Sequence, residues 1–490
     1  MRIRTSAACV LLSALLFVNA TMSNAHADTA PSFSTTTVGA NQAVGEPRVF
    51  VDPTSTGPRF FVVGPGIDSN GNVNTFMWWS MDGHKFSGPA LTNQAGGGND
   101  SDLAIDANHK VYAADLSDPQ GNSGVPISVW SPTTHKFHPV GEVAPGNTSL
   151  DRQWIASTST GHLAVIALDT NSGDEDAWTS SDSGAHFKQT SSPAASSVNV
   201  AGPLITGPAP AGGIPPLYFA YLHQNNDATA GVVGGTSDLR VAKSVDGGRT
   251  WTTKSVAQNQ SSTLFPVVAT DRSGGVYAAW SGTDPVSNNS DVIVFAASPH
   301  GGSTWNKPVA VSSNAVDALG NAPAAVFPWI VADGAGRVDV TYAIESQPLI
   351  NSPEGSDDGG PQSTWDLRVA QSLNATATKP TWTSSVAAAD FHTGSICSLG
   401  TLCVGPQELL GIGNVPTPFD RRDLDFFGSA VDASGKLYVP FCADRPALTG
   451  NPNDILFPNI DVRLSDQTGG PTIAAPSAKK KSSPKGRART

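Results

Sequence analysis

The chain has 490 residues, of which only 14% are charged, and its formal net charge at pH 7 is −12. Its 49 glycines and 37 prolines are typical of many short strands joined by turns, not of amphipathic helices. An acidic folded body argues against nucleic acid as the ligand.

The N-terminus has the features of a secretory signal. Arg2 and Arg4 precede an apolar run from Ala7 to Val18, and Ala25-His26-Ala27 offers small residues for cleavage. The apolar run is too short to span a membrane as a retained anchor. We therefore expect residues 1–27 to be a signal peptide and the mature protein to be secreted, starting near Asp28.

A turn-forming stretch, Ser244-Val245-Asp246-Gly247-Gly248-Arg249-Thr250-Trp251, recurs along the chain. The carboxylate of Asp246 can accept hydrogen bonds from turn N–H groups, the glycines permit positive φ angles, and Trp251 can pack beside the next strand. Related stretches run from Ser80 to Phe86 with Asp82, from Ser180 to Phe187 with Asp182, and from Ser298 to Trp305 with His300 in place of the carboxylate. Two more, from Ser131 to Phe137 and from Ser372 to Trp382, keep only the serine and the aromatic residue.

These stretches resemble the Asp-box, or bacterial neuraminidase repeat, of the sialidase-like β-propellers. We expect structural roles in the turns for Asp82, Asp182, Ser244, Asp246, Gly248, Trp251 and Trp305. The resemblance implies an all-β propeller of four-stranded antiparallel blades in a secreted bacterial protein. It also implies binding of extracellular glycans, acidic ones above all, and hydrolysis of a terminal sugar as a sialidase-like activity. The alternative is a non-catalytic propeller that binds a protein or a cell-wall partner.

Seven repeated units can be counted, each with an apolar strand, a Gly or Asp turn, a second strand, a polar loop and a third strand that leads to the turn described above. They begin near Glu46, Asp100, Asp151, Ala201, Leu264, Val326 and Asp425. The segment Ser34–Val38 resembles a fourth strand, so we expect it to complete the last blade and close the ring. Residues 28–470 then form one domain with seven blades, or with six if the irregular fourth unit is an insertion.

If the Asp-box turns lie between third and fourth strands, the loops at the opposite ends of the blades form the ligand-binding face. Candidate ligand-binding residues in those loops are Arg48, Asp151, Arg152, Trp154, Trp329, Arg421 and Arg422. By resemblance to sialidases, the arginines would grip a substrate carboxylate, because guanidinium binds carboxylate in a bidentate manner. The resemblance also implies a tyrosine nucleophile paired with a glutamate and an aspartate acid/base, for which Tyr221, Glu345 and Asp102 are the candidates. The alternative is that Asp–Arg ion pairs tie neighbouring blades together.

Three cysteines remain in the mature chain, and export makes a disulfide plausible. We expect Cys397 to pair with Cys403 across a short loop, with Cys442 as an alternative partner of either. No cofactor is expected to be required. Structural calcium is a further alternative, with oxygen ligands from Asp100, Asp102 and Asp115, or from Glu354, Asp357 and Asp358.

Residues 471–490 contain Lys479, Lys480, Lys481, Lys485, Arg487 and Arg489 among Ser, Pro and Ala. This composition predicts a disordered basic tail, which could associate electrostatically with an anionic envelope polymer. We expect the protein to be a monomer without a transmembrane anchor.

Overall fold

The computed structural model describes residues 30–68, 73–93, 98, 100–116, 124–195, 201–224, 237–260, 265–289, 291–312, 323–346, 363–394, 396, 425–444 and 460–475. All regular structure in these residues is β-strand, and none of them forms a helix with the length and apolar character needed to cross a lipid bilayer. The predicted signal peptide and the basic residues of the predicted tail lie outside the described residues.

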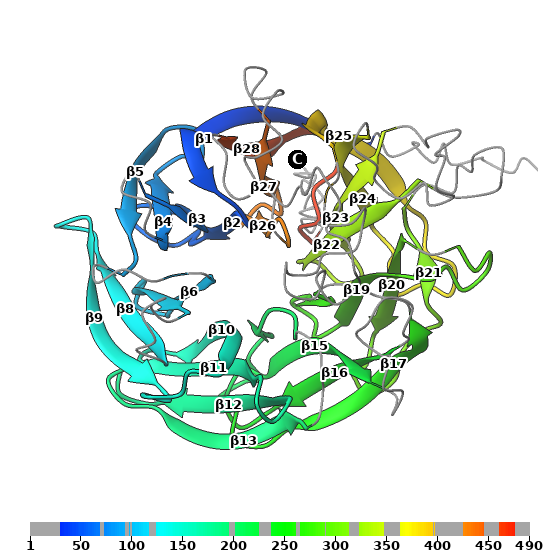
Figure 1. Cartoon of the computed structure of the whole chain (residues 1–490). Coiled ribbons are helices and arrows are strands. Elements are labelled where there is room, and N and C mark those ends of the chain that lie inside the picture. Colours follow the sequence, from blue (N-terminus) through cyan, green and yellow to red (C-terminus); the bar gives the residue numbers. More distant parts are fainter. Residues whose placement is uncertain are drawn as a thin grey trace, which may run out of the picture.

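Seven blades surround a central axis, and the chain passes through them in order (Figure 1). The expected seven-bladed, all-β propeller is confirmed. Within a blade the strands are antiparallel, with the first strand nearest the axis and the fourth on the outside. The first three blades consist of β2 (Arg48–Val51), β3 (Phe60–Ile67), β4 (Val73–Ser80) and β5 (Phe86–Leu91); β6 (Ser101–Ile105), β7 (Val111–Asp115), β8 (Val125–Ser131) and β9 (Lys136–Val143); and β10 (Leu150–Ser159), β11 (His162–Asp169), β12 (Asp174–Ser180) and β13 (Lys188–Ala194).

The irregular fourth unit forms an ordinary four-stranded blade, so the six-bladed alternative is wrong. Blades 4 to 6 consist of β14 (Ile205–Thr206), β15 (Leu217–Gln224), β16 (Ser237–Ser244) and β17 (Thr252–Gln260); β18 (Val267–Thr270), β19 (Val276–Gly282), β20 (Val292–Ser298) and β21 (Val309–Ala310); and β22 (Ala325–Ala332), β23 (Val338–Glu345), β24 (Thr364–Ser372) and β25 (Thr383–Thr393).

The last blade is closed by the N-terminal strand, as the sequence predicts. It consists of β26 (Ala430–Val431), β27 (Leu437–Ala443), β28 (Ile460–Gly469) and β1 (Ser32–Val44). Ser34 pairs with Asp466 and Thr37 with Arg463, while Val44, at the other end of β1, pairs with Gly66 of blade 1. Strand β1 therefore joins the two ends of the ring, and closure removes the free edge that an open sheet would expose.

Each blade is buried on both sides, because successive residues of a strand point to opposite neighbours. In β15, Phe219 and Tyr221 pack in one core cluster with Trp154 and Ile166 of blade 3, whereas Tyr218 and Ala220 pack in another with blade 5. This burial accounts for the continuous apolar run in such strands, in place of a polar and apolar alternation. Each fully buried aliphatic or aromatic side chain contributes about 1.5–3 kcal/mol.

The Asp-box turns connect third and fourth strands, as predicted, and share one hydrogen-bonding pattern. In blade 4, Ser244 Oγ donates to Asp246 Oδ1 at 2.8 Å, and the same carboxylate oxygen accepts the backbone N–H groups of Arg249 and Thr250. Equivalent Ser-to-Asp bonds occur at Asp82 and Asp182. In blade 6, Asn374 takes the place of the aspartate and accepts the Thr381 N–H at 2.9 Å. That stretch therefore keeps more of the turn than its serine and aromatic residue alone.

A second aspartate turn joins the first and second strands of several blades. In blade 5, Asp271 accepts the N–H groups of Ser273 and Gly275, and Tyr277 donates its hydroxyl to the other carboxylate oxygen. Tyrosines six residues after the turn aspartate make the same contact in blades 2 and 7, from Tyr112 and Tyr438. Gly336 of blade 6 also donates to Asp271, at 3.1 Å. These turns hold both the hairpin and the neighbouring blade, which explains the tyrosines of the second strands as structural residues.

Because first–second and third–fourth connections lie at the same ends of the strands, both kinds of turn face one side of the ring. We call this side the Asp-box face and the opposite side the upper face.

Candidate functional site

Arg152, a predicted ligand-binding residue, is buried beside the central axis and surrounded by carboxylates. It donates to both carboxylate oxygens of Glu46, at 2.8 Å each, and lies 3.1 Å from Asp100 and 3.5 Å from Asp425. These acids precede the first strands of blades 1, 2 and 7. Its side chain is 7% exposed. Arg152 thus links four blades through ion pairs, as the structural alternative expects.

The protonation of this cluster follows from its burial. Burial by itself lowers the pKa of Arg152, but Asp100 and Glu46 outweigh it, and the net shift is upward. Burial raises the pKa of Glu46 to about 8 against the attraction of Arg152, and the neighbouring Asp425 and Asp100 add to the rise. Three acids compete for one cation, so the guanidinium is fully occupied within the protein.

Arg48, in the first strand of blade 1, is bound in the same way. Its guanidinium forms an ion pair with Asp102, which also accepts the N–H groups of Leu103 and Ile155. The guanidinium lies over the rings of Phe50 and Trp329, at 4.4 and 4.9 Å from their centroids. Burial raises the pKa of Asp102 to about 6 even though Arg48 opposes the shift. A substrate carboxylate would have to displace Asp102 to reach Arg48.

The predicted tryptophans belong to an aromatic core around the axis. Trp154 is fully buried, donates Nε1–H to the Ala201 carbonyl at 2.7 Å, and packs on Phe265 and Phe426. Trp329 stacks on Phe426 with 5.4 Å between centroids. A cavity of about 240 Å³ lies among the first strands of blades 4 to 7 and reaches Arg48 and Trp329. Buried to this extent, the two indoles act as core residues and offer no open platform for a sugar ring.

The predicted catalytic residues are all buried. Asp102 has no exposed surface, Tyr221 is 2% exposed and Glu345 is 3% exposed. Tyr221 lies opposite Arg240 in the sheet and packs against Phe219 and His223, and Glu345 accepts a hydrogen bond from Ser363. Their catalytic roles stay predictions, and their burial argues against them.

Some of the predicted residues contribute little or lie outside the described part of the chain. Asp151 is half-buried, and its charge adds to that of Asp176 in raising the pKa of Glu175, which burial already holds well above its ordinary value. Within the described ranges, neither carboxylate oxygen of Glu175 has a hydrogen-bond partner, so nothing there offsets the effect of burial on its pKa. Outside the described residues lie Arg421, Arg422, Glu354, Asp357, Asp358, Cys397 and Cys403. Cys442 is buried and donates to the Val44 carbonyl at 3.1 Å.

The proposed calcium ligands on the upper face are engaged elsewhere. Asp100 lies against Arg152, Asp102 against Arg48, and Asp115 accepts the Thr92 hydroxyl at 2.8 Å. Across the described ranges, no group of three or more His, Cys, Asp or Glu side chains is arranged to hold a metal ion. Calcium stays an untested alternative.

A repeated Asp-x-Arg sequence in the third strands escaped the sequence analysis. Arg368 lies 3.2 Å from Asp366 and opposite Tyr342, and Arg463 lies 3.3 Å from Asp461 and opposite Phe441. Arg240 has the same relation to Asp238, at 3.9 Å. The signal was available as Asp-Leu-Arg-Val in two blades and Asp-Val-Arg-Leu in a third. Each arginine faces an acid of its own strand, so these residues belong to the framework of the blades.

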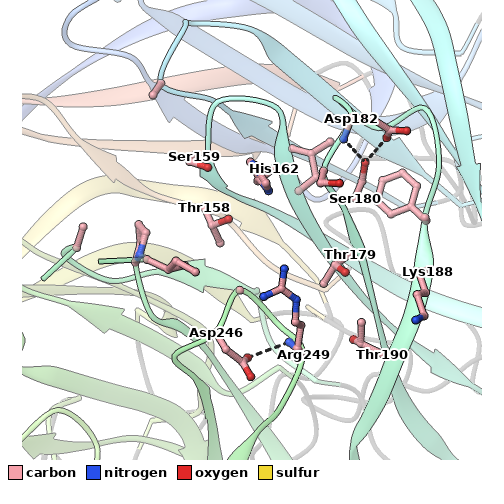
Figure 2. A pocket seen from close by; sticks show the side chains of 18 of the residues that line it. Thr158, Ser159, His162, Thr179, Ser180, Asp182, Lys188, Thr190, Asp246 and Arg249 are labelled. Carbon is pink, nitrogen blue, oxygen red and sulfur yellow. Dashed lines mark hydrogen bonds between the residues drawn. The ribbon is translucent and has the colours of Figure 1, made fainter. Parts of the chain in front are cut away.

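An open groove of about 1090 Å³ lies on the Asp-box face between blades 3 and 4 (Figure 2). Its walls are the β10–β11 turn, the two Asp-box turns, the start of β13 and the β14–β15 connection. Polar or charged lining residues are Thr158, Ser159, His162, Thr179, Ser180, Ser181, Asp182, His186, Lys188, Gln189, Thr190, Asp246 and Arg249, and the apolar ones include Leu163, Phe187, Ile214 and Pro215. Thr190 joins blades 3 and 4 below the groove by donating to the Gly248 carbonyl at 2.7 Å.

The carboxylates of the groove are engaged within the protein, whereas two of its cations are available to a ligand. Hydrogen bonds from His186 and Ser180 lower the pKa of Asp182 to about 2. Burial opposes a similar shift at Asp246, but the hydrogen bonds from Thr250 outweigh it and lower its pKa. Both carboxylates thus serve their own turns. Lys188 and Arg249 are exposed, and neither forms an ion pair in the described part of the chain; Figure 2 shows Arg249 reaching from its turn toward the strands of blade 3. The groove therefore offers hydroxyl groups, an apolar ledge and two available cations.

Comparison with solved structures shows the propeller fold in other proteins. A protein of unknown function from Dyadobacter fermentans gives a TM-score of 0.48 at 14% identity, covering 89% of this chain and 98% of its own. An ulvan lyase from a polysaccharide lyase family gives 0.49 at 11% identity, covering 90% and 97%. The endosialidase of phage phi92 gives 0.44 at 12% identity, covering 94% and 72%. The likeness is one of fold alone. No protein-family model matches the chain, and no curated protein sequence matches it.

Proposed function

We propose that this protein is a secreted, non-catalytic propeller that binds extracellular glycans, acidic ones above all, in the groove between blades 3 and 4. The observation that carries the proposal is the lining of this groove. A sugar presents hydroxyl groups along its edge and C–H groups on its faces, and a site for it needs polar partners beside an apolar ledge. The groove supplies both, with Thr158, Ser159 and Gln189 near Ile214 and Pro215.

The size of the groove favours a chain of sugars over a single residue. At about 1090 Å³ it lies just above the range of about 300–1,000 Å³ that is usual for small-molecule sites. It is also open to solvent, which suits a segment of a longer polymer.

The non-catalytic form of the proposal rests on the upper face. Arg48 and Arg152 are held by carboxylates, and Tyr221 is buried without a carboxylate partner among the described hydrogen bonds. A hydrolase that grips its substrate through these arginines would first have to break buried ion pairs, at a cost of about 3–5 kcal/mol each.

A glycan array probed with the mature protein tests binding, and a fluorogenic sialoside assay tests catalysis. We expect binding to polysaccharide probes and no turnover of the sialoside. Ile214→Ser removes part of the apolar ledge and should weaken binding about three- to tenfold, the equivalent of roughly 1 kcal/mol for lost apolar contact.

The matched control is Val245→Ser, since Val245 is 64% exposed, lies on the same turn as the groove residues and does not line the groove. Equal weakening by both changes, or sialoside turnover by the unchanged protein, would contradict the proposal.

A further inference from the structure

Every lysine that the structure describes lies at the Asp-box end of the blades. Seven are exposed, and none of these forms an ion pair within the described ranges: Lys85, Lys110, Lys136, Lys188, Lys254, Lys307 and Lys379. Two more are half-buried, Lys243 donating to the Gly301 carbonyl and Lys436 paired with Asp466. Each of the seven blades therefore contributes at least one lysine to this face.

The cations of the other face are arginines held within the protein. The described ones are Arg48, Arg152, Arg240, Arg368 and Arg463, and each lies within ion-pair distance of an aspartate or glutamate. Among the described residues, the positive charge that is available to a partner is thus concentrated on one side of the ring.

The carboxylates of the Asp-box face are engaged in hydrogen bonds within the protein. Asp82 and Asp182 are exposed and Asp246 is half-buried, but each accepts backbone N–H groups of its own turn. Asp52, Asp106, Asp271 and Asp333 are buried. Their oxygens accept N–H groups of the turns or face basic side chains of a neighbouring blade, as in the contact of Arg272 with Asp333. An exposed lysine above a buried, hydrogen-bonded carboxylate remains free to contact an anion.

The described chain also ends on this face. Ile473 donates to the Gly435 carbonyl at 3.2 Å, Gly334 donates to the Ile473 carbonyl at 2.8 Å, and Arg337 donates to the Thr472 carbonyl at 2.6 Å. These contacts place residues 472–473 under the first turns of blades 6 and 7. The sequence after residue 475 contains Lys479, Lys480 and Lys481.

We propose that the Asp-box face binds a linear polyanionic polysaccharide, with carboxylate or sulfate groups along its length, which is anchored in the groove and crosses the lysines of neighbouring blades. The inference rests on the proposed function, because the groove is its central contact. Lys188 and Arg249 stand on opposite walls of the groove. Lys136 begins β9, the outer strand of blade 2, and Lys254 lies in β17, the outer strand of blade 4. A neutral oligosaccharide would contact the groove alone, whereas a polyanion contacts the groove and the lysines of the neighbouring blades.

The test compares binding of the full mature chain to polygalacturonate, dextran sulfate and neutral dextran over a range of salt concentrations. A groove variant carries Lys188→Gln and Arg249→Gln. A face variant carries Lys85→Gln, Lys110→Gln, Lys136→Gln, Lys307→Gln and Lys379→Gln. A third variant carries Gln at Lys479, Lys480 and Lys481. Asp390→Asn, at an exposed position of the upper face, is the control for a change of charge on the opposite face.

We expect tight, salt-sensitive binding to the two anionic polymers and weak binding to dextran. The groove variant should bind both polyanions about tenfold more weakly, as expected for the loss of a charged contact of about 1.4 kcal/mol. The face variant should also lose about tenfold, with a reduced dependence on salt, since several exposed charge contacts of 0.2–1 kcal/mol are removed. Asp390→Asn should leave binding unchanged.

Several results would overturn the inference. If the unchanged protein binds no glycan at all, the proposed function fails. If it binds but prefers dextran, or if the face variant keeps its affinity and salt dependence, the glycan site stands and the polyanion inference fails. The inference also fails if the change at Lys479, Lys480 and Lys481 alone removes all salt dependence, or if duplex DNA binds as tightly as polygalacturonate at equal salt.

Discussion

Replacing Arg152 by methionine distinguishes a structural role of this arginine from a role in binding the ligand. Methionine has a similar length and fills the same apolar surroundings of Trp154, Phe265 and Phe426, so packing is nearly kept. What is lost is the only described cation within reach of Glu46, Asp100 and Asp425. Breaking a buried pair in this way typically costs about 3–5 kcal/mol of the free energy of unfolding.

The pH dependence of this cost follows from Glu46. Burial raises the pKa of Glu46 to about 8 in wild type, and Arg152 is the largest cause that lowers it, so the pKa rises further when Arg152 is lost. Both proteins then hold Glu46 protonated from pH 5 to pH 7, and this group adds no difference between them in that range. Above pH 8, wild-type Glu46 ionises beside Arg152, whereas Glu46 of the variant must stay protonated at a cost of roughly 1.36 kcal/mol per pH unit. A folded-state pKa raised above the unfolded value gives stability that is present at low pH and is lost as the pH rises, so the variant should lose more stability than wild type between pH 7 and pH 9.

The measurement is urea unfolding of wild type, Arg152→Met and Arg152→Lys at pH 7 and pH 9. We expect Arg152→Met to lose about 3–5 kcal/mol at pH 7 and about 1 kcal/mol more at pH 9, and Arg152→Lys to lose less than Arg152→Met at pH 7, because a charge is retained. A loss below about 1 kcal/mol at pH 7, or a loss that does not grow at pH 9, would refute the ion-pair role. An Arg152→Met protein that is stable but no longer binds glycan would indicate that Arg152 binds the ligand.

Three further changes test other parts of the fold. Burial raises the pKa of Asp115 to about 7, so wild type should lose stability relative to Asp115→Asn as the pH rises from 5 to 8, by about 2–3 kcal/mol in urea unfolding; a constant difference would contradict this. Asn374→Asp should raise the free energy of unfolding by about 0.5 kcal/mol, and with it the urea midpoint, because a carboxylate accepts the Thr381 N–H more strongly than an amide does; a lowered midpoint would show that the turn differs from the Asp-boxes. Gly202→Ala would place Cβ 1.7 Å from the Pro266 carbonyl oxygen and should cost about 3 kcal/mol or more, whereas Gly57→Ala, with 3.6 Å to its nearest atom, should be nearly neutral by thermal unfolding.

The architecture could be inferred from the chain because its signals are local. A serine, an aspartate and a glycine a few residues apart make a turn by themselves, as Ser244, Asp246 and Gly248 do. Repetition of that turn predicts repeated hairpins, and Ser34–Val38 could be matched to a missing fourth strand for the same reason. The hydrogen bonds that define these elements join residues close in sequence, or strands whose order is given by the repeat.

The roles of the charged residues could not be inferred in this way. Arg48 and Arg152 are far in sequence from Asp102, Glu46 and Asp425, and nothing in their own segments shows that these acids meet them at the axis. An arginine that grips a ligand and one that joins blades look alike until its partners are placed. The burial of Tyr221 could not be inferred from its own segment either, because it depends on packing against blade 3.

The sequence of this protein was sufficient for its turns, its repeat and the closure of its ring, since each depends on short-range hydrogen bonding and on alternation within a strand. Packing of seven blades around one axis decided the rest. This packing holds the described arginines of the upper face in ion pairs. It also places the exposed lysines together on the Asp-box face and forms the groove between blades 3 and 4. These are contacts between segments far apart in the chain, and only the folded ring brings such charges and surfaces together.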